Sequence, residues 1–143
     1  NNEEAIRILH VNGIEIAAYF LIEPNYTVSD FVALGDYVDR LNLTHPVFTI
    51  LTPFPGTELF KKRYTELTDR NYELFDFCHS LLPTKLPLKI FHECLANLYR
   101  RCYATDKNRE GRKSVVSQIT GQQFYRGFLE GYKDYEKISI FQY

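Results

Sequence analysis

The sequence predicts an α/β fold, and two observations support this class. Two almost unbroken apolar runs, 14–22 and 47–52, have the β-branched and aromatic composition of strands that are buried on both faces. Between them, a pattern resembling a capping box at Thr27–Asp30 precedes apolar residues at helical spacing. Two apolar strands joined by a helix are typical of a parallel βαβ unit with a right-handed crossover.

The other elements follow from their apolar spacing and end signals. Asn12-Gly13 ends a first helix, Thr57 can cap another, and Pro87 suits the first turn of a third. These signals and the apolar stripes predict helices at 3–11, 57–66, from 87 to about 102, and 111–135. We divide the chain into βα units, residues 1–68, and an aromatic-rich connection with a C-terminal helical hairpin, residues 69–143.

Composition excludes several classes of protein. The 143 residues suit one domain, and a formal net charge of -1 argues against a nucleic-acid partner. No apolar run approaches the roughly 18 residues that span a bilayer, so we expect no transmembrane segment. Cys78, Cys94 and Cys102 have no metal-ligand spacing, so we expect no metal site from them and infer reduced thiols in the cytoplasm.

Two parallel strands make an incomplete sheet. A parallel sheet normally has several strands and covered faces, so this pair would leave apolar faces and edges exposed. Either the strands join a larger sheet on further sequence, or they pair with another copy. We infer a fragment of a larger enzyme, and we expect that the isolated chain self-associates through its exposed strand edges.

The loop 52–57 is the first candidate site. It follows the second strand at its carboxyl end, where parallel α/β proteins bind ligands. Glu23 ends the first strand at the same edge and can hold a ribose hydroxyl or an amine, or receive a helix terminus. His79 is the best candidate for acid-base chemistry, although a structural histidine is the more common case. Phosphate cradles, nucleophile elbows and zinc-protease motifs are absent.

The stretch Phe-Thr-Ile-Leu-Thr-Pro-Phe-Pro-Gly-Thr-Glu-Leu at 48–59, preceded by Gly-Ile-Glu-Ile-Ala-Ala-Tyr-Phe-Leu-Ile-Glu-Pro at 13–24, resembles the late strands of radical S-adenosylmethionine enzymes of the cobalamin-binding branch. Asn-Tyr-Glu-Leu-Phe-Asp at 71–76 and Leu-Pro-Thr-Lys-Leu-Pro at 82–87 extend the similarity. Together, residues 1–103 resemble the C-terminal part of hopanoid C-3 methylase-type proteins.

This resemblance implies the C-terminal portion of a partial (β/α)6 TIM-like barrel, with two parallel strands and flanking helices, followed by a helical region. It implies a methyltransferase that acts on an unactivated carbon of a lipid-like, hopanoid-type substrate. The whole enzyme would use S-adenosylmethionine, a [4Fe-4S] cluster and cobalamin. The cluster cysteines match nothing here, so we expect this chain to bind none of these cofactors and to be inactive without the missing N-terminal half, its implied partner. A lipid substrate would bring a cytoplasmic protein to the membrane surface.

The site residues follow from the same resemblance. The family's Gly-x-Ile-x-Gly adenine motif falls on residues 18–22, where both glycines are replaced. We expect cofactor contacts from Phe20, Ile22, Glu23, Leu51, Thr52 and Pro53, and substrate contacts from Phe54 and His79. Two alternatives stay open: a non-catalytic protein-interaction module that binds through the aromatic segment 72–77, or a radical S-adenosylmethionine oxidoreductase or cyclase with another substrate.

Overall fold

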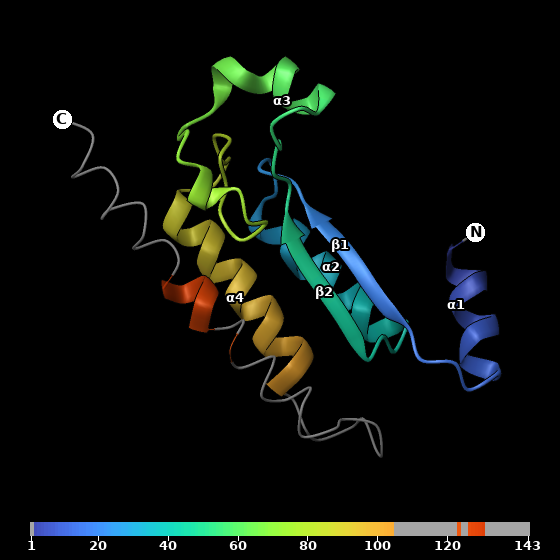
Figure 1. The fold of residues 1–143 in the computed structure, drawn as a ribbon. Coiled ribbons are helices and arrows are strands. Elements are labelled where there is room, and N and C mark those ends of the chain that lie inside the picture. The colour runs from blue at the N-terminus through green and yellow to red at the C-terminus, as the bar shows by residue number, and fades with distance from the viewer. Residues whose placement is uncertain (1, 105–122, 124–125, 131–143) are drawn as a thin grey trace.

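A computed structural model describes residues 2–104, 123 and 126–130 of the chain (Figure 1). The α/β class is confirmed, since two parallel strands are flanked by helices. The elements in chain order are α1 (Asn2–Val11), β1 (Ala17–Ile22), α2 (Val28–Arg40), β2 (His45–Ile50), α3 (Glu58–Arg63), the 3₁₀ turns η1 (Tyr64–Glu66) and η2 (Tyr72–Leu74), and α4 (Leu88–Ala104).

The two strands pair in parallel through the predicted crossover. Ala17 lies opposite His45 and Ile22 lies opposite Ile50, so both strands end together. The predicted strand limits were wrong in detail: β1 begins at residue 17 rather than 14, and β2 covers 45–50 rather than 47–52. The sequence did not predict that β2 begins before Pro46, because proline lacks the N–H that an inner strand needs. Proline is tolerated on an edge strand, which β2 is.

Only one face of the sheet is covered in the described part of the chain. Ile22, Phe48 and Ile50 are fully buried beneath α2 and α4, whereas Tyr19 and Leu21 on the opposite face are 74% and 50% exposed. The expectation that both strands are buried on both faces was therefore wrong for the described residues. Each strand has a covered and a more open side; both sides of β1 are apolar, whereas the more open side of β2 carries His45, Val47 and Thr49.

Helix α2 begins as the sequence predicts. The Thr27 hydroxyl accepts from the Asp30 N–H, and the Asp30 carboxylate accepts from the Thr27 N–H, which completes a capping box. Phe31 then packs edge-on against Phe91 of α4, with ring centroids 5.4 Å apart. Gly35 matters here, because a β-carbon at this position would lie 2.6 Å from the Arg101 guanidinium of α4.

The outer edge of β2 is closed by a tyrosine from α4. The Tyr99 hydroxyl accepts a hydrogen bond from the Phe48 N–H at 2.9 Å and donates one to the Phe48 carbonyl at 2.7 Å. Burial raises the pKa of Tyr99 well above its ordinary value, so this hydroxyl keeps the proton that it donates. One side chain thereby satisfies both backbone groups that a further strand would have paired.

The neighbouring groups on this edge are also satisfied. The Tyr103 hydroxyl donates to the Pro46 carbonyl at 2.6 Å, and the Ile50 N–H donates to the carbonyl of Phe77 at 2.7 Å. The edge of β2 is therefore closed from Pro46 to Ile50. The edge of β1 has no strand beside it in the described part of the chain, so the sheet can be extended there.

The C-terminal region is described only in part. The predicted helix 111–135 falls mostly outside the described residues, but 126–130 are helical, and Phe128 stacks on Tyr99 with centroids 5.2 Å apart. The division of the chain at residue 68 stays a prediction. Among the helices that the structure describes, none is long and apolar enough to cross a membrane.

We expect Tyr99→Phe to destabilise the protein by roughly 1–3 kcal/mol, because it leaves a buried donor and a buried acceptor of Phe48 unpaired. Urea denaturation followed by circular dichroism measures the change. Tyr37→Phe is the matched control, since the structure records no hydrogen bond for that hydroxyl among the described residues, and we expect a change within about 0.5 kcal/mol. Equal losses in both variants would contradict the role of Tyr99.

Candidate functional site

The candidate site lies where β1 and β2 end. Since Ile22 and Ile50 are partners in register, the residues after them leave the sheet side by side. The Leu51 N–H donates to the Ile22 carbonyl at 2.9 Å, and the Thr52 hydroxyl donates to the Ile50 carbonyl at 3.0 Å. These bonds hold the start of the predicted loop against the strand ends.

The rest of the loop 52–57 is a rigid turn. Gly56 has a φ of 89°, which favours glycine. The Thr57 hydroxyl accepts from the Phe60 N–H at 3.1 Å, as the sequence predicts for a helix cap, and donates to the Phe54 carbonyl at 2.7 Å. The same side chain therefore begins α3 and fixes the position of Phe54.

The residues proposed for cofactor contacts lie in two environments. The Ile22 side chain is fully buried, and Phe20 stacks on Phe48 with centroids 5.6 Å apart, so both side chains belong to the core. Only the backbone groups of these two residues are left for contacts at the strand ends, and the Ile22 carbonyl already accepts a hydrogen bond from the Leu51 N–H. Glu23, in contrast, is exposed directly after β1.

The proposed cofactor-contact residues that follow β2 are mostly buried. Thr52 and Pro53 are both buried, and the Thr52 hydroxyl is engaged with the strand end. Leu51 is half-buried. Glu23, Leu51, Thr52 and Pro53 are thus brought to one end of the sheet, with Glu23 contributing the charge.

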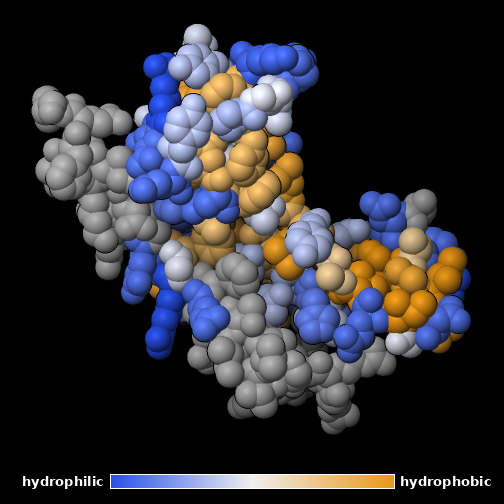
Figure 2. All heavy atoms as spheres, in the orientation of Figure 1, coloured by the Kyte–Doolittle hydropathy of each residue, from blue (hydrophilic) through white to orange (hydrophobic). Residues whose placement is uncertain are grey.

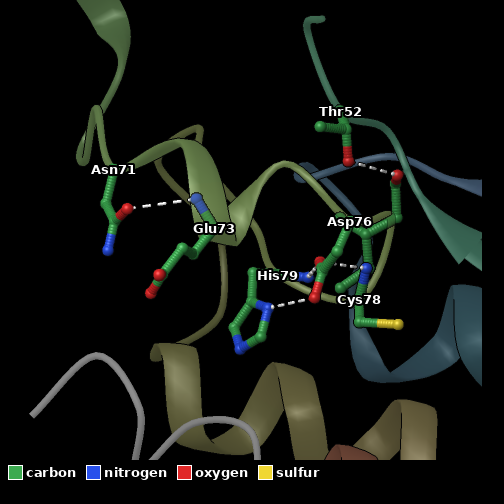
Figure 3. Close-up of polar contacts among 7 residues, drawn as sticks. Thr52, Asn71, Glu73, Asp76, Cys78 and His79 are labelled. Carbon is green, nitrogen blue, oxygen red and sulfur yellow. Dashed lines mark hydrogen bonds and ion pairs between the residues drawn. The ribbon is translucent and has the colours of Figure 1, made fainter. Parts of the chain in front are cut away.

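His79 pairs with a carboxylate that sequence reasoning missed (Figure 3). The Nδ1 atom of His79 lies 2.9 Å from Oδ2 of Asp76, and Oδ1 of Asp76 accepts from the N–H groups of Cys78 and His79 at 2.8 and 3.0 Å. Burial raises the pKa of Asp76, but the hydrogen bonds from His79 and Cys78 outweigh it and lower the pKa below its ordinary value. The available signal was the Asp-x-x-His spacing in an irregular segment.

A second histidine lies beneath this pair. His92 of α4 is fully buried, and its ring centroid is 6.3 Å from that of His79. Burial and the neighbouring His79 lower the pKa of His92 to about 4, so it is neutral at pH 7. This burial favours a structural role for His92.

An aromatic cluster covers the same end of the sheet. We define it as the rings of Phe54, Phe60, Phe75 and Phe77. Phe77 lies 4.7 Å from Phe54 between centroids, and Phe75 bridges Phe54 and Phe60 at 6.4 and 6.2 Å. Tyr72 stacks on Phe75 from outside and is 73% exposed. Apolar ring surface therefore lies beside the loop that was expected to contact substrate.

The residues present do not fit an iron–sulfur cluster. Cys78 and Cys94 are half-buried, Cys102 is fully buried, and the structure groups none of them with other ligands. In the part of the chain that the structure describes, no three His, Cys, Asp or Glu side chains are placed to hold a metal ion. For binding and positioning, the described residues of this site offer apolar rings, backbone groups and the Glu23 carboxylate.

Comparison with known proteins gives two relatives. The chain is 32% identical over 126 residues to a hopanoid C-3 methylase of Methylococcus capsulatus, which covers 88% of this chain and 24% of the relative. It is 30% identical over 105 residues to a bacteriochlorophyllide d C-12(1)-methyltransferase of Chlorobaculum tepidum, which covers 72% of this chain and 23% of that relative. No family model matches the chain. No solved structure matches it either.

These relatives define a class of protein. Both are methyltransferases by name, and the chain spans about a quarter of the length of each. The resemblance to hopanoid C-3 methylase-type proteins drawn from the sequence is confirmed, and this chain is similar to one part of each of these two longer methyltransferases.

We expect burial of neutral His92 to make stability depend on pH. Its pKa is lower in the folded than in the unfolded chain, so the stabilisation is complete above about pH 6.5 and is lost as the pH falls towards 4. Between pH 7 and 5, the unfolding free energy should fall by about 2 kcal/mol more than in His92→Gln. Urea denaturation at both pH values tests this, and identical pH slopes would contradict it.

Proposed function

We propose that this chain is the C-terminal part of a cobalamin-dependent radical S-adenosylmethionine methyltransferase that methylates an unactivated carbon of a hopanoid-type, lipid-like substrate. The observation that supports this proposal is the similarity to two methyltransferases over 88% and 72% of the chain. Each of these relatives is about four times as long as the region that matches. One relative's name specifies a hopanoid and the other's a bacteriochlorophyllide. The alignment with the hopanoid C-3 methylase covers the larger part of this chain.

The partner in this proposal is the N-terminal half of the same enzyme, and its contact surface is the open edge of β1. Closure of the β2 edge leaves β1 as the strand to which a sheet can be extended, and the open sheet face beside it carries exposed Tyr19 and Leu21. Figure 1 shows α1 on the β1 side of the sheet, away from β2. A helix that leads into β1 there is arranged as the crossover from a preceding parallel strand.

Exposed apolar residues of α1 support this surface. Ile8, Val11 and Ile14, on or just after the helix, are 48%, 75% and 52% exposed, and Figure 2 shows the apolar patch over α1. A barrel strand paired with β1 would cover such side chains. Self-association of the isolated chain would use the same open edge, so both kinds of partner compete for β1.

The chain's role in this enzyme is to bind and orient. When bound in the whole enzyme, S-adenosylmethionine would supply the radical and cobalamin the methyl group, and the cluster would be held by residues outside this chain. Glu23, exposed at the end of β1, would accept hydrogen bonds from ribose hydroxyls. Leu51 and Pro53 would pack on the adenine, while backbone atoms of Phe20, Ile22 and Thr52 line the strand ends. Phe54 and His79 would lie on the substrate side.

The test uses the full-length protein with its cluster and cobalamin reconstituted. Incubation with a low-potential reductant for the cluster, with S-adenosylmethionine that carries a deuterated methyl group and with a hopanoid should yield a hopanoid that gains one labelled methyl group, detected by mass spectrometry. Formation of 5′-deoxyadenosine without methylated hopanoid would exclude this substrate and favour an oxidoreductase, a cyclase or another substrate. Absence of 5′-deoxyadenosine would overturn the radical assignment.

We expect Glu23→Gln in that enzyme to raise KM for S-adenosylmethionine about tenfold, since hydrogen bonds to a charged group are each worth roughly 1.5–3 kcal/mol. Glu15→Gln is the matched control, because Glu15 is also exposed but lies before β1, at the opposite end of the sheet. Steady-state kinetics measures both variants. Equal KM values for Glu23→Gln and the wild type would remove Glu23 from the cofactor site.

A further inference from the structure

We propose that the aromatic cluster is a binding platform for the fused-ring hydrocarbon of the substrate, with Phe77 as its exposed surface and the Asp76–His79 pair as the device that positions Phe77. This inference rests on the proposed function and deepens it. It adds Phe77 as a contact residue and gives His79 a positioning role in place of acid-base chemistry.

Phe77 has an unusual backbone. Its φ is 65°, in the left-handed region that bulky residues rarely adopt because the β-carbon approaches the following carbonyl. Such a conformation persists when the surroundings determine it. Here the Phe77 carbonyl accepts the Ile50 N–H at 2.7 Å, so the strained residue is joined directly to the end of β2.

Asp76 and His79 hold the other side of Phe77. One carboxylate oxygen of Asp76 accepts from the N–H groups of Cys78 and His79, and the other lies 2.9 Å from Nδ1 of His79 (Figure 3). The carboxylate therefore bridges across Phe77 to the residues that follow it. The Nδ1 atom of His79 is engaged in this bridge, and His79 is 8% exposed.

The strained residue presents apolar surface to solvent. Phe77 is 45% exposed although its ring is tilted against Phe54 at 4.7 Å. Phe54 in turn follows Pro53 at the carboxyl end of β2, where parallel α/β proteins bind ligands. Figure 2 shows apolar side chains gathered on this face, between α3 and the strands. The platform is thus continuous with the candidate site.

The phenylalanine rings of the aromatic cluster favour one chemical class of ligand. Benzyl rings offer apolar area and no hydrogen bond, so they favour a flat hydrocarbon over a polar metabolite. The fused rings of a hopanoid have this character. Two charged groups near the cluster are engaged elsewhere, since Asp76 binds His79 and Arg70 lies over the Tyr64 ring at 4.7 Å. We therefore assign the platform to the ring system of the substrate.

The chain offers a direct test because it contains no tryptophan. Phe77→Trp places a single fluorophore on the platform, and Tyr37→Trp places one on α2 as the matched control. Titration with a hopanoid solubilised in cyclodextrin should shift the indole emission of Phe77→Trp to shorter wavelength in a saturable manner and leave the control unchanged. Cyclodextrin alone should shift neither. An unchanged spectrum of Phe77→Trp, or equal shifts in both reporters, would overturn the platform.

Second substitutions in the Phe77→Trp chain separate contact from positioning. Phe54→Leu should weaken hopanoid binding about fivefold to tenfold by removing one aromatic ring of the platform. Asp76→Ala should weaken it similarly through loss of the bridge, whereas Asp76→Asn keeps an acceptor for the backbone N–H groups and should restore most of the affinity. Equal affinities in Asp76→Ala and Asp76→Asn would overturn the positioning role.

If the Phe77→Trp variant folds poorly, the melting temperatures of two further variants test whether the backbone of Phe77 is strained. Phe77→Gly and Phe77→Ala both delete the ring, but glycine adopts positive φ freely. The melting temperature of Phe77→Gly should therefore exceed that of Phe77→Ala by several degrees. Equal values would mean that the strain is absent.

The outcomes also separate this inference from the proposed function. Methylation of hopanoid with a KM that is unchanged by Phe77→Leu would overturn the platform and keep the methyltransferase. Hopanoid binding that depends on Phe77, without methylation by the full-length enzyme, would support the platform and overturn the reaction.

Discussion

The pair of hydrogen bonds between Tyr99 and the backbone of Phe48 determines where the sheet ends. By satisfying both groups of one edge residue, the hydroxyl replaces a neighbouring strand and holds α4 along β2. That position of α4 buries His92 beneath His79 and places Tyr103 on Pro46. The connection before α4 then reaches the last backbone group of the edge, at Ile50. The sheet is left with a closed side and an open side.

This asymmetry also arranges the candidate site. The carboxyl ends of the strands lie beside a connection with no strand of its own in the described residues, whose shape comes from side chains bonded to nearby backbone. Asn71 caps one 3₁₀ turn, and Asp76 organises the next three residues. Such local hydrogen bonds give an irregular segment a defined conformation without a helix or a strand.

The division of labour in the proposed enzyme follows from the same geometry. In that proposal, the apolar face with Tyr19 and Leu21 would contact the rest of the enzyme, and the loop after β2 and the aromatic cluster would contact the cofactor and the substrate and exclude water. None of the described residues forms a group that could hold a metal. A chain of this kind would position the cofactor's adenosyl group and the substrate, while the remaining three quarters of a protein of the relatives' length would supply the cluster and cobalamin.

The sequence by itself determined the features that have local causes. Capping at Thr27 and Thr57, the helix after Pro87 and the parallel pairing of two apolar strands follow from neighbouring residues, and all are present. It did not determine which face of each strand is covered, because both faces of β1 are apolar. The side chains of Phe20 and Ile22, two residues predicted to contact the cofactor, lie in the core. Only tertiary structure decided that Tyr99 closes an edge 51 residues away and that Asp76 and Ile50 together hold Phe77. Such contacts depend on how distant segments pack, which no local pattern encodes.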